Sequence, residues 1–292
     1  MASGETTTGS LADSLPTIIA DARIVREYEG TWKRTCDVRD QAKGTGLSWN
    51  EISLAQLSAQ DITETTINQN FQQLADTLFT ITPAMTQIAL KITDRTYRKI
   101  AAVVESKVGS LAGNAMARKK DEDYLDLFST FGTGASPLTG NPLSFGHIAA
   151  AKNRISSNVT EPSSAPVYAV LHGFQIKDLQ DEVLAGIGTF TVPDGMTEQV
   201  YRKGFMGTVA GANVFEDGNI TVDATPDARG AVHSGDAVVA VLGMGIKTEQ
   251  RRDPSFGGGA DEIFMTDEYG FGERSAGNWA FTILSDATAP TS

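Results

Sequence analysis

A helix much longer than average is the feature that most constrains this sequence. Between Arg95 and Phe131, apolar residues recur three or four positions apart, which is the spacing of one face of an α-helix. Thr93 and Asp94 are suitable N-caps, and Gly132 is a suitable C-cap. An unbroken helix over these residues would be about 55 Å long. We expect it to lie across the molecule as a strut, with the other elements packed around it.

Two glycines and two charged runs carry further expectations. Gly109 and Gly113 share one face of the predicted helix, where the missing side chains would let a sheet or another helix approach closely. The run from Arg118 to Asp123 has three basic residues followed by three acidic ones, which favours a solvated helical face over a nuclear-localisation signal. We interpret the adjacent acids Glu216 and Asp217 as exposed or turn-forming.

Residues 131 to about 245 have the pattern of a compact α/β unit. Short continuous apolar runs are typical of strands buried on both faces, and amphipathic stretches are typical of helices that cover them. In chain order we expect a helix at 141–155, a strand at 166–172, a helix at 174–184, a hairpin at 204–222 with its turn at 216–219, and a strand at 237–242.

Strand patterns flank this unit on both sides. Residues 78–92 alternate between apolar and polar, and Pro83 favours an edge or a bend there. Residues 262–271 and 278–285 form two more predicted strands after a glycine-rich loop at 251–260. The mixture of a long helix, an α/β unit and separate strands predicts an α+β fold.

The first 77 residues have little core pattern. The first 34 look like an arm, with a small polar stretch followed by a short helix-capable one. From Thr35 to Gln73 the chain is polar, and its few apolar residues lie near the middle. A segment of this length without a core is unusual inside a compact domain. It is either a surface loop or an extended arm whose apolar residues pack on another chain.

The charge balance excludes several functional classes. The chain carries 24 Lys and Arg against 36 Asp and Glu, a formal charge of −12. This argues against binding nucleic acid by neutralising phosphates, and against attachment to anionic membranes. No window approaches the roughly 20 apolar residues of a membrane span, and the first ten residues do not resemble a signal peptide. We therefore expect a cytosolic product with no membrane partner.

Residues suited to catalysis or metal binding are scarce. Cys36 is the only cysteine, and the three histidines are His147, His172 and His233. His172 ends a predicted buried strand, so we interpret it as a core residue and the other two as surface residues. Nucleophile-elbow, P-loop, HExxH and EF-hand patterns are all missing. The sequence predicts no enzyme, no catalytic or metal site, and no cofactor.

Several phrases of the sequence occur in an order that is hard to obtain otherwise. They are NFQQLADTLFTITPAM at 70–85, ITDR at 92–95, AMARK at 115–119, YAVLH at 168–172, GTVAG at 207–211, GDAVV at 235–239 and WAFTILSD at 279–286. Together with the predicted elements, these phrases resemble the major capsid protein of tailed bacteriophages (Caudoviricetes). The resemblance covers nearly the whole chain after the arm.

The resemblance implies the tailed-phage major capsid fold in five parts. These are an N-terminal arm at 1–34, an extended loop at 35–77, a peripheral domain with the spine helix at 78–130, an axial domain at 131–244, and return strands of the peripheral domain at 245–292. The peripheral sheet would be shared by 78–92 and 245–285. The extended loop would overlap a neighbouring subunit through the contact candidates Lys43, Trp49, Ile52, Leu54 and Leu57.

The function implied is that of a shell subunit. Copies would form the hexamers and pentamers of an icosahedral virion capsid that is assembled in the host cytoplasm. Scaffolding, portal and decoration proteins would be partners, and double-stranded DNA would be enclosed without sequence-specific binding. Some relatives cross-link the shell through a Lys–Asn isopeptide bond, and Lys43 lies in the corresponding loop. Residues 1–130 carry a net charge of −3 and residues 131–292 carry −9, so the wall would offer DNA few cations.

Two alternatives remain open at this point. An encapsulin-like compartment has the same fold and would hold a cargo enzyme instead of a genome. An acidic α/β enzyme would have a site formed by scattered residues near His172 and Asp178.

Overall fold

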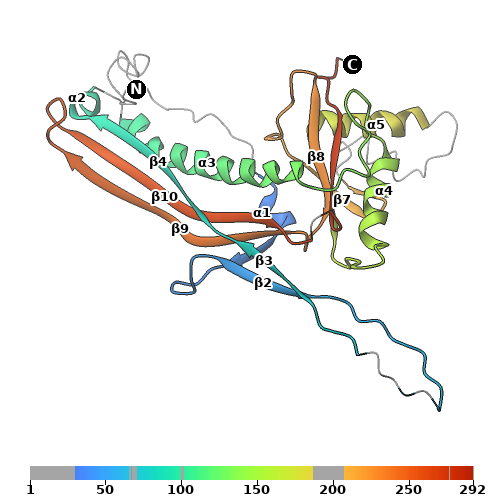
Figure 1. The fold of residues 1–292 in the computed structure, drawn as a ribbon. Helices are drawn as coiled ribbons and strands as arrows, with labels where there is room; N and C mark the ends of the chain where they lie inside the picture. Colours follow the sequence, from blue (N-terminus) through green and yellow to red (C-terminus); the bar gives the residue numbers. More distant parts are fainter. Residues whose placement is uncertain are drawn as a thin grey trace.

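The computed structural model describes residues 30–65, 67, 71–99, 102–186, 207–275 and 277–291, with the backbone alone described at 102–106 and 183–186. The chain is elongated, with a long sheet on one side, a five-stranded sheet on the other, and a two-stranded ribbon that extends away from both (Figure 1). Most of the predicted arm lies outside the described residues.

The long sheet combines segments from both halves of the chain. Its strand order is β1-β9-β10-β4. The strands are β1 (Asp37–Asp40), β4 (Ala84–Thr93), β9 (Val238–Asp253) and β10 (Ala260–Glu273). β9 and β10 form an antiparallel hairpin, β4 is antiparallel to β10, and β1 is parallel to β9. The later part of the strand region predicted at 78–92 does meet the strand predicted at 262–271 in one sheet, as β4 and β10. The first part, at 78–81, lies instead in β3 (Asp76–Ile81) of the two-stranded ribbon, so the prediction of one shared sheet is wrong for these residues.

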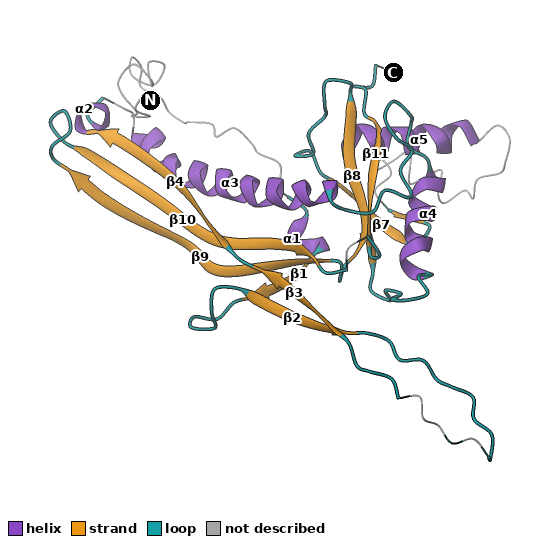
Figure 2. Ribbon diagram, viewed as in Figure 1, coloured by secondary structure: helices purple, strands orange, loops and turns teal. Residues whose placement is uncertain are grey.

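A long helix, α3 (Ala102–Asp126), lies along one face of this sheet (Figure 2). Its buried Ala112 and Met116 pack against Met265 of β10, and Ile88 and Leu90 of β4 border the same cluster. The strut expected from the sequence is therefore present, with apolar residues of the helix buried against the sheet.

The predicted helix is nevertheless not continuous. A separate turn of helix, α2 (Asp94–Tyr97), comes first, and the Thr93 side chain accepts a hydrogen bond from Thr96 N as its cap. α3 has 25 residues, which makes it about 37 Å long. It tightens into a 3-10 turn, η2 (Leu127–Ser129), whose Phe128 is fully buried where the chain passes to the second sheet.

The glycines near and within this helix have other roles than expected. Gly132 does not cap the helix, because it forms a β-bridge with Phe281 instead. A Cβ added at Gly109 or Gly113 would meet no described atom within 4 Å, so the expected close approach is not made within the described part of the chain.

The five-stranded sheet has the order β11-β8-β5-β7-β6, with two helices, α4 and α5, beside it (Figure 2). The elements are α4 (Phe145–Ser156), β5 (Val167–Leu171), α5 (Gly173–Gly186), β6 (Thr208–Val209), β7 (Ala212–Glu216), β8 (Asp227–Ser234) and β11 (Ala280–Asp286). Ile148, Ile155, Leu179 and Ile283 are fully buried in one core cluster. A second cluster, with Tyr124 and Phe128, joins the sheet to the end of α3 and to η2.

Three expectations for this half of the chain are wrong. The last strand, β11, pairs with β8, so it belongs to the five-stranded sheet and not to the sheet of β4 and β10. The hairpin turns at Ala210 and Gly211, both at positive φ, and not at 216–219. The buried strand predicted at 237–242 is present as the start of β9, but it belongs to the long sheet and not to the α/β unit in which it was expected. These errors share a cause: a buried strand pattern does not say which sheet the strand joins.

The ribbon is formed by β2 (Trp49–Leu54) and β3 (Asp76–Ile81). It follows α1 (Trp32–Thr35) and β1, which are held in the body, and Trp32 is buried against Phe271. The segment that leaves the body therefore begins after Asp40, later than the predicted start at residue 35. None of the described helices is long and apolar enough to cross a membrane.

Candidate subunit interface

The two faces of the ribbon differ in what they contact. The antiparallel register places Trp49 opposite Ile81, Glu51 opposite Phe79, and Ile52 opposite Leu78. Because paired residues share a face, Trp49, Phe79 and Ile81 lie together, and their rings and methyl groups pack on Val239 and Val241 of β9. This face anchors the ribbon to the body.

The opposite face of the ribbon is exposed, and three of its six paired residues are large and apolar. Ile52, Leu54 and Leu78 alternate along the two strands and are 62%, 66% and 61% exposed. Further large apolar side chains, Leu57, Phe71 and Leu74, are exposed in the connection between the strands. Scattered exposed leucines are ordinary, but a contiguous row on a projecting ribbon is a feature of interaction surfaces. We call Ile52, Leu54 and Leu78 the apolar ribbon face.

The structure places the predicted contact residues in three settings. Ile52 and Leu54 lie on the open face of β2, Leu57 lies in the connection after it, and all three are exposed. Trp49 is half-buried and meets Phe79 edge to face, with ring centroids 6.1 Å apart. Lys43 is exposed in the turn before β2. Leu78, which was not among the predicted contact candidates, lies opposite Ile52 on the same exposed face, and this place could have been found by pairing the two alternating segments.

A second polar centre lies where α1, α3 and the turn after β7 meet. Asp121 and Asp217 are both fully buried there. Thr31 N donates to Asp121 Oδ1 at 3.0 Å and to Asp217 Oδ2 at 3.2 Å, and Asn219 Nδ2 donates to Asp121 Oδ2 at 2.8 Å. Desolvation, followed by the charge of Asp217, raises the pKa of Asp121 to about 7. The two carboxyls can share a proton, since no Lys or Arg in the described part of the chain forms an ion pair with either.

These positions correct the sequence interpretation. Asp121 is not part of a solvated helical face, because it accepts a hydrogen bond from the segment that enters the body before α1. Asp217 accepts from the same segment and is buried rather than exposed, but it does form a turn, since its Oδ1 accepts from Asn219 N. Gly30 allows this approach, since a Cβ there would collide with the Asp121 carboxylate. The interpretation holds for Arg118 and Glu122, which are exposed and form an ion pair one turn apart.

His233 was predicted on the surface and is instead fully buried. Its Nε2 lies 2.7 Å from the Tyr124 hydroxyl, and its Nδ1 lies 2.9 Å from the carbonyl oxygen of Ser234. Burial lowers its pKa to about 4. His147, by contrast, is half-buried and completes the capping box of α4 with Ser144. His233 is thus a neutral core residue, bonded on both ring nitrogens.

In the structure, the two residues named for the enzyme alternative, His172 and Asp178, each accept a hydrogen bond from a backbone N–H. His172 is partly buried, which lowers its pKa, and its Nδ1 accepts from Phe174 N. Asp178 accepts from Leu143 N at 3.0 Å, so it is occupied in holding the start of α4. Within the described residues, no group of three His, Cys, Asp or Glu side chains could hold a metal ion. A cleft of about 430 Å³ beside Asn219 and Arg229 has no His or Cys in its lining.

No protein-family model and no curated protein matches the chain. Solved structures do match. A structure from Mycobacterium phage Che8 has a TM-score of 0.70 at 16% identity, with 94% of this chain and 98% of that chain covered. The capsid structure of cyanophage P-SCSP1u has a TM-score of 0.67 at 15% identity, with coverages of 97% and 96%. The capsid of Ralstonia phage GP4 has a TM-score of 0.69 at 11% identity, with coverages of 99% and 100%.

This chain has the tailed-phage capsid fold. The predicted α+β class and the predicted fold are confirmed by these matches. Because the matches span almost the whole length of both chains, the capsid fold includes the long sheet with α3, the five-stranded sheet, and the ribbon. The identities of 11% to 16% place the similarity in the fold rather than in particular residues.

Proposed function

We propose that this chain is the major capsid protein of a tailed bacteriophage, which assembles with copies of itself into an icosahedral shell. The observation that carries the proposal is the apolar ribbon face, displayed by a chain with the capsid fold. Burying such a face requires another surface, and a second copy of the same chain can supply it. The proposed role is structural, without enzymatic activity.

The parts of the fold have matching roles in this proposal. The long sheet with α3 is the peripheral domain, and the five-stranded sheet with α4 and α5 is the axial domain, around which hexamers and pentamers form. The ribbon with the connection at 55–75 is the extended loop that overlaps a neighbouring subunit. We keep Lys43 as a contact candidate because it is exposed at the base of the ribbon.

Charge supports a role in enclosing DNA. The formal charge of −12 leaves the wall few cations with which to hold phosphates, so packaged DNA would be enclosed without sequence-specific binding. We propose the virion capsid as the location, with assembly in the host cytoplasm and with scaffolding, portal and decoration proteins as partners. The encapsulin-like alternative and the enzyme alternative are not favoured, since the matched structures are phage capsids.

Electron microscopy of the purified protein under assembly conditions tests the proposal. We expect closed icosahedral particles, or hexameric and pentameric rings. A stable monomer at high concentration would contradict the shell function. Particles that contain a cargo protein instead of DNA when isolated from cells would favour the encapsulin-like alternative.

A triple variant tests the ribbon directly. Replacing Ile52, Leu54 and Leu78 each by Ser removes the apolar face while keeping both strands. We expect an unchanged unfolding midpoint of the free subunit and loss of assembly, seen by sedimentation and microscopy. The matched control, Ser53→Ala with Thr77→Ala, alters the same strands on the other face and should assemble like the wild type. Normal assembly of the triple variant would remove the ribbon from the interface.

A further inference from the structure

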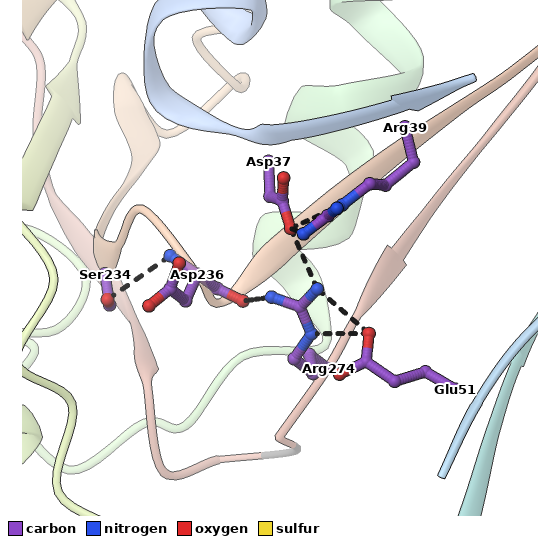
Figure 3. Close-up of polar contacts among 6 residues, drawn as sticks. All are labelled: Asp37, Arg39, Glu51, Ser234, Asp236 and Arg274. Atoms are coloured by element: carbon purple, nitrogen blue, oxygen red, sulfur yellow. Dashed lines mark hydrogen bonds and ion pairs between the residues drawn. The ribbon is translucent and has the colours of Figure 1, made fainter.

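Arg274 lies at the point where the two sheets and the ribbon meet. It directly follows β10, on the connection that leads to β11 in the other sheet. Its side chain is only 13% exposed. The guanidinium points toward carboxylates from two other segments and toward a backbone carbonyl (Figure 3). A nearly buried cation that bonds several distant segments can fix their relative positions.

Each partner of Arg274 belongs to a different part of the chain. Nη1 donates to the carbonyl oxygen of Asp236 at 2.7 Å, and the backbone N donates to the Ala237 carbonyl oxygen at 2.8 Å. Both acceptors lie on the connection between β8 and β9, which is another crossing between the sheets. Nη2 donates to Asp37 Oδ2 of β1 at 2.9 Å. One side chain therefore joins the sheet crossings to the N-terminal strand.

The remaining partner is Glu51 of the ribbon. Arg274 Nε and Nη2 donate to Glu51 Oε2 at 3.1 Å and 3.0 Å. Glu51 lies on the anchoring face of the ribbon, opposite Phe79. Otherwise this face meets the body through apolar contacts of Trp49, Phe79 and Ile81. Apolar packing is not directional, whereas charge-assisted hydrogen bonds from a planar guanidinium fix an angle.

The guanidinium of Arg274 is the cation between two carboxylates, those of Asp37 and Glu51. Nη2 is shared by the carboxylates of Asp37 and Glu51, so the cation separates two negative groups. Burial raises the pKa of Asp37, but the hydrogen bonds from Arg274 and Arg39 outweigh it and the net pKa is lowered. Without the guanidinium, the ribbon carboxylate would face the β1 carboxylate with no cation between them. Arg39 would still be bonded to Asp37, so loss of Arg274 should release the ribbon from the body by removing both hydrogen bonds to Glu51.

We propose that Arg274 is the positioning residue that sets the direction in which the β2–β3 ribbon leaves the subunit. This deepens the proposed function and rests on it in one respect: the ribbon direction decides where the apolar ribbon face meets a second copy. Arg274 itself does not contact that copy in this proposal. It acts through Glu51.

Hydrogen exchange of the unassembled subunit tests the proposal independently of assembly. In Arg274→Gln, amides of residues 49–54 and 76–81 should exchange about three- to tenfold faster, the factor expected for the net loss of one hydrogen bond of ordinary strength. Exchange in β5, β8 and β11 should stay unchanged. Arg39→Gln is the matched control, because Arg39 bonds the same Asp37 carboxylate and, among the described residues, has no hydrogen bond or ion pair to the ribbon. Wild-type exchange in the ribbon of Arg274→Gln would overturn the proposal.

A double-mutant cycle with Glu51→Gln separates positioning from general stability. If Arg274 acts through Glu51, the effect of Arg274→Gln on ribbon exchange should be smaller in the Glu51→Gln background. Additive effects would overturn the proposal. Glu51→Gln alone also serves if Arg274→Gln fails to fold, since it leaves the bonds to Asp37 and Asp236 intact. Microscopy should then show misclosed or missing particles for both variants. If the wild-type protein itself never assembles, the shell function is contradicted, but the exchange result still tests the role of Arg274.

Discussion

The five-stranded sheet and the ribbon use similar residues with opposite outcomes. Leu179 and Ile283 of the sheet region have no exposed surface, whereas Ile52 and Leu54 of the ribbon are more than 60% exposed. The sheet has a helix layer on one face and the end of α3 on the other, so its core is complete within the chain. The ribbon has one anchored face and one open face. The comparison separates the residues that fold the subunit from those available to join subunits.

The largest expected effect tests the completeness of the sheet core. Leu179→Ala removes a fully buried side chain of α5 and should lower the unfolding free energy by about 2 to 5 kcal/mol. Leu54→Ala removes the same atoms from the ribbon and should change it by less than about 0.5 kcal/mol. Urea unfolding of the unassembled subunit measures both. Comparable losses in the two variants would mean that the ribbon face is buried within the subunit in solution.

The next effect is a pH dependence of the unfolding free energy, which should come from buried groups in the body and not from the ribbon. The folded-state pKa of Asp121, raised to about 7 by burial and by Asp217, lies above its unfolded value near 3.8. The stability it contributes is therefore complete below pH 4 and is lost as the pH rises through 7. His233 acts in the opposite sense, because its pKa is lowered to about 4 and its contribution is lost as the pH falls below 6.5. Only a comparison of variants separates the two.

Asp121→Asn isolates the first of these terms. Asn cannot ionise, so the stability difference between this variant and the wild type should shift in favour of the variant as the pH rises from 5 to 8. Urea midpoints measured across that range give the slope. The matched control is Asp126→Asn on the exposed side of the same helix, which should show no such trend. Parallel curves for Asp121→Asn and the wild type would contradict a proton held between Asp121 and Asp217.

Sequence reasoning succeeded where a local pattern decides the outcome. The central turns of α3 and the buried strand β5 both follow from spacing along the chain. The capsid fold itself came from the resemblance, through the order of many short phrases. Both kinds of signal are written in neighbouring residues, so they could be read without knowing the tertiary structure.

Failures occurred where distant segments decide the outcome. The buried bond between Thr31 and Asp217 spans 186 residues, and that between Tyr124 and His233 spans 109. A polar residue with such a partner has the same local sequence as an exposed one. The alternating pattern of β11 likewise shows that it has a buried face but not that β8 is its neighbour. The contacts of Arg274 with Asp37 and Glu51 belong to the same class.

The smallest expected effect concerns Trp49, where the two sides of the comparison meet. Trp49 was predicted to contact another subunit, yet its ring packs edge to face on Phe79 at the root of the ribbon. Trp49→Ala should lower the free energy of local opening of the ribbon by about 1 kcal/mol, the size of one aromatic pair. It should therefore loosen β2 and β3 without changing the global unfolding midpoint. Hydrogen exchange of the free subunit would show the loosening. Ile52→Ala, on the open face, should leave exchange unchanged but weaken assembly. If Trp49→Ala weakened assembly with normal ribbon exchange, the anchoring role would be wrong and Trp49 would belong with the apolar ribbon face after all.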